Sequence, residues 1–169
     1  MIKVEDRTSK HLGKLVEEAL GPLFLVVPKE DLNGIDKILL LDKCSDAEFS
    51  WAGGFYCKPP NGESAYIELY PSKIINAQPV FLPRIKFFKK YSIIKMFLHE
   101  LGHHKTGIEN LEKRENEAEK YMLSYLKRIY GNWVYLFDFM ARINDVFNRI
   151  VDGLQKHQTV SKQRKNRRQ

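Results

Sequence analysis

The sequence predicts an α+β fold in which a small, mostly antiparallel sheet packs against helices. Two observations support this class. The first half of the chain contains short runs rich in branched and aromatic residues, separated by proline and glycine turn signals. From about residue 91 the apolar residues instead recur at every third or fourth position, which is typical of amphipathic helices. A region of strands followed by a region of helices indicates an α+β arrangement.

Length and composition are those of a globular protein with one core. The chain has 169 residues, of which 43% are hydrophobic and 29% are charged. We expect a single domain over residues 1–157 and a basic tail over residues 158–169. The last eight residues contain five bases and no acid. Such a tail could contact nucleic acid through phosphates, but a run of like charge more often stays solvated, and we favour the solvated tail.

The sequence predicts a cytoplasmic protein without a membrane partner. It begins with charged residues and has no apolar signal segment. Its longest apolar run, Trp133 to Met140, is interrupted by Asp138 and is too short to cross a bilayer. Cys44 and Cys57 do not form a C-x-x-C pair, so reduced thiols are favoured over a disulfide.

The first part of the chain predicts one helix and then two strands. Thr8 to Leu20 has apolar residues at helical spacing, capping residues at its start and Gly21-Pro22 after its end. Leu23 to Val27 and Lys37 to Leu41 are short runs rich in branched residues, which predict strands. A proline and an Asn-Gly turn signal separate the two runs.

A β-hairpin is predicted next. Phe49 to Lys58 and Ala65 to Tyr70 flank the turn signal Pro59 to Gly62, and Gly53-Gly54 indicates a bulge or bend in the first strand. The second strand alternates apolar and polar residues, so one of its faces should be buried. It is either an edge strand that pairs with an extended substrate or an ordinary amphipathic strand. Pro71 to Pro83 is expected to be a connector.

The most informative stretch is the H-E-x-x-H motif formed by His99, Glu100 and His103. A helix is predicted to begin at residue 91 or 92, and histidines four apart on a helix can bind one zinc ion while the glutamate reaches a water on that ion. The histidines point away from the apolar side of this helix, which consists of Ile93, Ile94, Phe97, Leu98 and Leu101. His104 projects into the apolar arc, so it is predicted to be hydrogen-bonded and not a ligand.

A second helix, from about Asn110 to Tyr130, should return antiparallel to the motif helix. At about 1.5 Å per residue, its second turn comes level with the last turn of the motif helix, so it can supply a third metal ligand. Helical phase alone does not decide which glutamate this is. We rank Glu117 first and Glu115 second, and we expect solvent exposure or lysine pairing for the two others, Glu112 and Glu119.

A final amphipathic helix is predicted from Asn132 to about Gln155. Core packing is its expected role, and binding of a partner is the alternative.

Together these residues resemble the ImmA/IrrE-like metallopeptidases, a family of the gluzincin type. The resemblance covers roughly residues 60–126. His99 to His103 matches the zinc motif, and Glu117-Ala118 followed by Tyr121-Met122 stands where the family has a pattern like E-A-x-x-F-A. The family implies a zincin-like fold, Glu117 as third ligand, and a cytosolic zinc peptidase, some members of which act on repressors. This chain departs from the family in Met122 and in the absence of an evident N-terminal helix-turn-helix.

The sequence therefore predicts a zinc-dependent endopeptidase that hydrolyses an intracellular protein, a regulator or repressor being the expected class. His99, His103 and Glu117 would hold Zn²⁺, and Glu100 would be the general base for a metal-bound water. The alternative is a nucleic-acid- or regulator-binding protein with a structural or vestigial metal site, but such a site usually has a fourth protein ligand. An additional electrophile is not decided by the sequence, and the candidates are Tyr66, Tyr121 and His104.

Overall fold

The computed structural model describes residues 2–44, 51–77, 85–106, 111–137, 139 and 140. The chain divides into two compact units, Met1–Gly131 and Asn132–Gln169. In the second unit, residues 133–137 and 139–140 are helical, and Trp133 stacks on Phe137 with ring centroids 6.3 Å apart. The rest of the predicted final helix, the predicted boundary at residue 157 and the basic tail lie outside the described residues.

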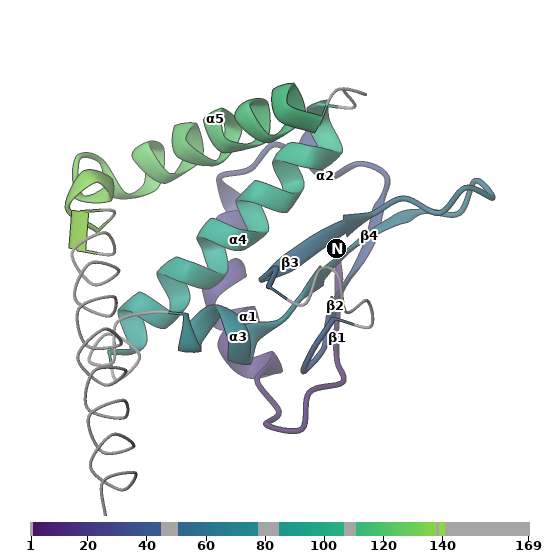
Figure 1. Cartoon of the computed structure of the whole chain (residues 1–169), viewed down its shortest axis with the longest axis horizontal. Coiled ribbons are helices and arrows are strands. Elements are labelled where there is room, and N and C mark those ends of the chain that lie inside the picture. The colour runs from purple at the N-terminus through teal and green to yellow at the C-terminus, as the bar shows by residue number, and fades with distance from the viewer. Residues whose placement is uncertain (1, 45–50, 78–84, 107–110, 138, 141–169) are drawn as a thin grey trace, which may run out of the picture. The chain divides into compact units, whose positions relative to one another are not determined.

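The first unit contains a four-stranded sheet and a set of helices (Figure 1). The elements follow one another in the order β1 (Lys3–Asp6), α1 (Gly13–Leu20), the 3-10 helix η1 (Leu23–Leu25), α2 (Lys29–Leu32), β2 (Ile35–Leu40), β3 (Gly54–Cys57), β4 (Ala65–Leu69), α3 (Pro71–Asn76), α4 (Lys86–Thr106) and α5 (Leu111–Tyr130).

The sheet is mixed, so the coarse α+β class is confirmed and the prediction of a mostly antiparallel sheet is wrong. The strand order is β1-β2-β4-β3. β1 pairs with β2 and β2 pairs with β4 in parallel, and only the β3–β4 pair is antiparallel. The difference arises from two parallel pairs: β2 lies beside β4 and not beside β3, and on its other side it pairs with β1, a strand that the sequence pattern did not predict. β1 leads into α1, and the intervening helices let β2 return beside β1 in the same direction.

The predicted hairpin is confirmed as β3 and β4, but the edge strand is β3. β4 lies between β2 and β3, so it has no free edge for a further strand. Its Ala65, Ile67 and Leu69 are buried, whereas Tyr66 and Glu68 on the other face are half-buried, as its alternation predicted. Any strand that adds to this hairpin must therefore add beside β3.

Two predictions for the N-terminal part are wrong for local reasons. Helix α1 begins at Gly13 and not near Thr8, because Asp6 Oδ2 accepts the N–H of Gly13 at 2.6 Å and Thr8 Oγ1 accepts the N–H of Leu12 at 3.2 Å. His11 has a positive φ of 48°, which interrupts a helix. The predicted strand after it is the 3-10 helix η1, in which the N–H of Val26 bonds to the carbonyl of residue 23 at 2.9 Å.

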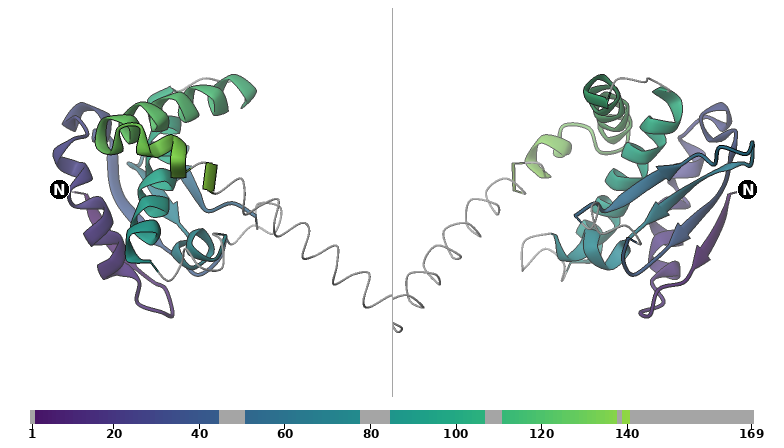
Figure 2. Two further views of the ribbon diagram at one scale, coloured as in Figure 1. Left: turned by 90° about the vertical axis from the view of Figure 1, so that its left-hand side faces the viewer. Right: turned by 45° about the vertical axis from the view of Figure 1, so that its right-hand side comes forward.

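Helix α4 is the central helix of the unit. It packs against α1, α3, β3 and β4 on its sheet side and against α5 on its outer side, and Figure 2 shows the helices on one face of the sheet. α4 begins at Lys86, earlier than predicted, so the basic and aromatic residues 86–91 belong to it. Lys86 and Lys90 form ion pairs with Glu18 of α1 at 2.7 and 3.0 Å. These lysines therefore link α4 to α1 by ion pairs.

Helices α4 and α5 form the predicted antiparallel hairpin. The ring of Tyr130, the last residue of α5, packs edge-on against Tyr91 and Phe87 at the start of α4, with centroids 5.3 and 5.9 Å apart. α5 ends where predicted, at Gly131, which has a φ of 59° and donates to the carbonyl of Lys127 at 2.8 Å.

Cys44 and Cys57 are half-buried and not joined in a disulfide, as predicted. Among the described residues, no helix combines the length and apolar character that crossing a membrane requires.

Candidate metal centre

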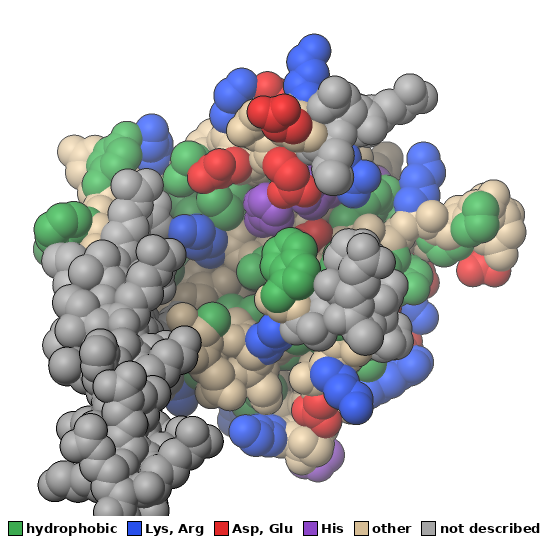
Figure 3. Space-filling model, viewed as in Figure 1, with side chains coloured by type: hydrophobic (Ala, Val, Ile, Leu, Met, Phe, Trp, Pro, Cys, Tyr) green, Lys and Arg blue, Asp and Glu red, His purple; other side chains and the backbone are tan. Residues whose placement is uncertain are grey.

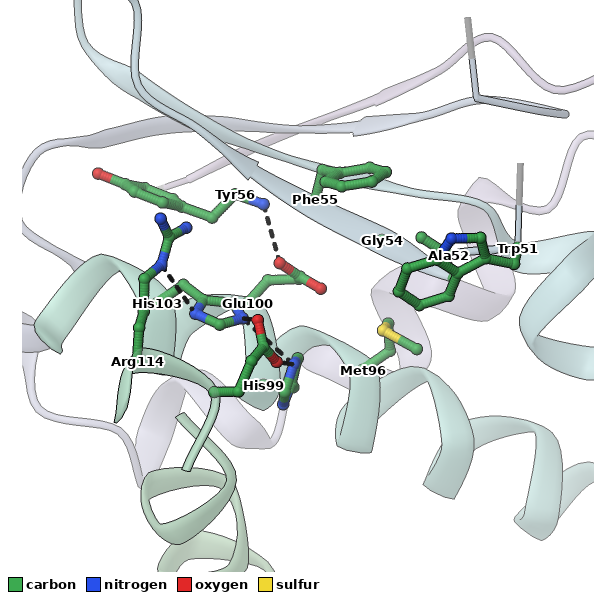
Figure 4. A pocket seen from close by; sticks show the side chains of 12 residues that line it. Trp51, Ala52, Gly54, Phe55, Tyr56, Met96, His99, Glu100, His103 and Arg114 are labelled. Atoms are coloured by element: carbon green, nitrogen blue, oxygen red, sulfur yellow. Dashed lines mark hydrogen bonds and ion pairs between the residues drawn. The ribbon is translucent and has the colours of Figure 1, made fainter. Parts of the chain in front are cut away.

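The H-E-x-x-H residues occupy the last turns of α4, as the helical pattern predicted. Phe97, Leu98 and Leu101 are fully buried on the sheet side of the helix, which fixes its rotation. His99 is then half-buried and His103 buried on the side that α5 approaches. Figure 4 shows the two imidazoles next to each other at the floor of a pocket.

The two histidines and Glu115 form a triangle of potential metal ligands. Nε2 of His99 and Nε2 of His103 are 3.2 Å apart, and each lies 3.3 Å from an oxygen of the Glu115 carboxylate. Three ligand atoms placed 2.0–2.1 Å from one ion at tetrahedral angles are about 3.3–3.4 Å apart. The atom types and the separate pair distances therefore suit zinc, with the two 3.3 Å distances ending at different oxygens of the Glu115 carboxylate.

Glu115, the second-ranked candidate, approaches the histidines in place of Glu117. The Glu117 carboxylate forms an ion pair with Lys120 at 2.7 Å. The reason is the rotation of α5, in which Ala118 is completely buried and faces α4. Glu115 lies about one turn before Ala118 and shares its side, whereas Glu117 is rotated by about 100° from it. The spacing of Glu115, Ala118 and Met122 by three and four residues was the sequence feature that could have placed Glu115 on the side of α5 that faces α4.

Gly102 permits this close approach of the two helices. A Cβ atom at Gly102 would lie 2.7 Å from the Cα and 2.9 Å from the backbone oxygen of Ala118. Real side chains do not tolerate such distances to backbone, so only glycine fits at this position. The glycine inside the motif thus determines how near α5, and with it Glu115, can come to the histidines.

Glu100 is a buried carboxylate beside the triangle, with only 5% of its surface exposed. Its Oε2 accepts the backbone N–H of Tyr56, on β3, at 2.9 Å. Burial raises the pKa of Glu100 to about 7; the Tyr56 hydrogen bond and Arg114 lower it, and Glu115 raises it. A bound cation would move this pKa down again. A carboxylate of this kind is suited to exchange protons near neutral pH.

Both histidines are held in the neutral form that metal binding requires. Burial lowers the pKa of His99, and Glu115 opposes that shift. Burial, helped by His99 and Arg114, lowers the pKa of His103 to about 4. Nδ1 of His103, the nitrogen on the outer side of the ring, accepts a hydrogen bond from Nε of Arg114 at 3.2 Å.

His104 is hydrogen-bonded and remote from the triangle, as predicted. Its Nε2 donates to the carbonyl of Asn33 at 2.8 Å, so its Nδ1 accepts from the hydroxyl of Tyr56 at 3.0 Å. The backbone N–H of Tyr56 in turn bonds to Glu100. His104 therefore helps to hold the strand that positions the buried carboxylate.

A pocket of about 390 Å³ opens over the triangle (Figure 4). The residues that line it are Trp51, Ala52, Gly53, Gly54, Phe55, Tyr56, Met96, His99, Glu100, His103, Arg114 and Glu115. One wall is apolar, and Arg114 is the single lysine or arginine among these described residues. Figure 3 shows histidine side chains exposed beneath a group of acidic side chains.

None of the three sequence candidates for an additional electrophile lines this pocket. The hydroxyl of Tyr121 donates to Asp31 at 2.7 Å, His104 bonds to the Asn33 carbonyl, and Tyr66 lies on the half-buried face of β4. Sequence reasoning instead missed residues of the pocket wall. The only sequence feature that pointed to this wall was the pair Gly53-Gly54. A Cβ at Gly53 would lie 2.5 Å from Met96 Cε, and a Cβ at Gly54 would lie 3.2 Å from Glu100 Cγ. The glycine pair lets β3 lie directly against α4.

The chain was compared with family models, curated proteins and solved structures, and none of them matches it.

Proposed function

We propose that this protein is a zinc-dependent peptidase whose metal is held by His99, His103 and Glu115. The observation that carries the proposal is that two histidine nitrogens 3.2 Å apart each lie 3.3 Å from one oxygen of the Glu115 carboxylate, with the buried Glu100 carboxylate beside them. When bound, zinc would supply a Lewis acid that activates water and polarises a carbonyl. His104, which could have closed a structural site as a fourth protein ligand, is engaged by Asn33 and Tyr56, and this argues against a purely structural metal.

Glu100 is the proposed general base. The N–H of Tyr56 holds one carboxylate oxygen, and the other faces the pocket, where it can take a proton from the attacking water (Figure 4). The same carboxyl group then gives that proton to the leaving amine, so the residue ends the cycle ionised as it began. The neighbouring backbone bond restricts the carboxylate to one orientation, which favours both transfers.

An extended polypeptide is the proposed substrate, bound beside β3. The carbonyl of Gly53 accepts from Tyr70 on the β4 side, and the N–H of Tyr56 points to the opposite side, to Glu100. Because backbone groups alternate along a strand, Gly54 also presents its N–H and C=O away from β4. A peptide strand added there would lie next to the triangle. The resemblance to ImmA/IrrE-like peptidases supports a repressor or other intracellular regulator as the substrate protein.

Two glutamates on α5 provide a matched test of the metal site. We expect Glu115→Gln to lose most zinc binding and Glu117→Gln to bind zinc like the wild type, because only the first carboxylate meets the histidines. Zinc content after purification without chelator and competition with a chromophoric chelator measure this. Equal zinc affinity in the two variants would show that the assigned ligand is wrong.

Glu100→Gln tests catalysis separately from metal binding. We expect this variant to keep its zinc and to lose at least about 100-fold in cleavage rate, since a general base contributes about 10²–10⁴. Comparing the proteomes of cells that express the wild type or the variant would reveal the target as a protein lost only with the wild type. Undiminished cleavage by the variant, or protein that contains no zinc, would refute the peptidase.

A further inference from the structure

Arg114 occupies an unusual position behind a potential metal ligand. Its Nε lies 3.2 Å from Nδ1 of His103, while its side chain also lines the pocket. A guanidinium group can only donate hydrogen bonds, so Nδ1 of the ring must accept. In a neutral imidazole the single N–H is then on Nε2.

The proton of His103 therefore lies on the nitrogen that faces the triangle. Nε2 is 3.3 Å from the Glu115 carboxylate, which can accept that N–H, and 3.2 Å from Nε2 of His99. Arg114, His103 and Glu115 thus form a chain in which each donor meets an acceptor. This arrangement gives both ring nitrogens of His103 a partner without a cation.

Zinc on Nε2 is incompatible with the bond from Arg114. A metal takes the lone pair of Nε2, so the ring proton must be on Nδ1, and a protonated Nδ1 cannot accept from a guanidinium. Histidines that bind metals usually donate this outer N–H to a carboxylate or a carbonyl oxygen. Here the neighbour is a donor and carries a positive charge, which also repels a cation.

We propose that Arg114 opposes zinc loading through His103 and, once zinc has displaced it from that ring, binds the negatively charged oxygen that develops on the substrate carbonyl. The inference rests on the proposed function. Loading moves one proton from Nε2 to Nδ1 by exchange with water, with no net change in proton number. The released guanidinium is the single arginine or lysine among the described pocket-lining residues, so it is the group suited to stabilise an oxyanion there.

The test compares Arg114→Met with Arg128→Met, which makes the same change on an exposed position of the same helix. Competition with a chromophoric chelator should show zinc binding roughly tenfold tighter in Arg114→Met, the size of effect typical of residues behind a metal ligand. Cleavage of a peptide substrate should show kcat reduced about 100-fold with KM changed less. Arg128→Met should match the wild type in both.

The opposite directions of the two effects separate this role from a structural one, since a disturbed fold would weaken zinc binding and activity together. Unchanged or weaker zinc binding in Arg114→Met overturns the inference and leaves the peptidase intact. Tighter zinc binding with unchanged kcat overturns the catalytic half. If neither the wild type nor the variants bind zinc, the proposed function fails as well.

A second measurement uses the wild-type chain alone. Nitrogen-15 NMR of the histidine rings distinguishes a proton on Nδ1 from one on Nε2. We expect the His103 proton on Nε2 in protein stripped by a chelator and on Nδ1 after zinc alone is added. A proton on Nδ1 before zinc addition would contradict the inference, whether or not the variants fold.

Discussion

The contact between Gly102 and Ala118 predicts that one added methyl group damages the candidate metal centre. In Gly102→Ala the new Cβ would lie 2.7 Å from the Cα of Ala118, whereas ordinary contact begins at 3.4 Å. The helices must therefore separate locally by about 0.7 Å (3.4 − 2.7 Å). Glu115 lies one turn from this contact and moves with α5.

The cost in stability should be modest and the cost in zinc affinity large. Overpacking typically costs about 1–3 kcal/mol, and replacing a helical glycine by alanine returns about 1 kcal/mol, so we expect a net loss of about 0–2 kcal/mol. Metal–ligand distances, in contrast, tolerate only about 0.2 Å. A displacement of about 0.7 Å for Glu115 should weaken zinc binding at least tenfold.

Urea unfolding and chelator competition on the same protein measure the two quantities. Ala118→Gly is the control and should not rescue Gly102→Ala, because the nearest atoms are the Cα and backbone oxygen of residue 118, which glycine retains. A Gly102→Ala variant with wild-type zinc affinity would refute the idea that this contact sets the position of Glu115. Rescue by Ala118→Gly would show that the Cβ of Ala118 is the obstacle.

Two further predictions concern pH. In chelator-treated protein, burial raises the pKa of Glu100 from its ordinary 4.5 to about 7, so the contribution of Glu100 to stability is complete below pH 4.5 and is lost as the pH rises through 7. Between pH 5 and pH 8 this loss is about 3 kcal/mol ((7 − 5) × 1.36), and urea unfolding should show that Glu100→Gln removes it. An unchanged slope in the variant would count against this role of Glu100. Burial alone would raise the pKa of Asp31, but its hydrogen bonds outweigh burial and lower this pKa below 3.8. The stabilisation that Asp31 contributes is therefore present above pH 3.8 and is lost as the pH falls through the lowered pKa. Asp31→Asn should abolish that acid-dependent loss and cost about 1–3 kcal/mol at pH 7, and wild-type stability would contradict the role of its partners, Lys105, Tyr121 and Tyr125.

Local periodicity accounts for what the sequence determined about this protein. The 3.6-residue repeat placed His99 and His103 opposite the buried side of α4 and identified His104 as a hydrogen-bonded residue. Alternation and turn residues identified the β3–β4 hairpin. Each of these features depends on residues within a few turns or one loop of each other, so the pattern along the chain was sufficient.

Tertiary contacts decided the rest. The strand β1 has only four residues, and it is recognised as a strand by its pairing with β2. That β3 is the edge strand of the hairpin depends on the order of all four strands. The choice of Glu115 over Glu117 depends on the rotation of α5, which the packing of Ala118 on Gly102 fixes. Arg114 reaches His103 through the same rotation. The sequence alone contains the residues of the H-E-x-x-H motif. The packing of α5 on α4 determines that Glu115 and Arg114 are the carboxylate and the basic side chain beside the histidines.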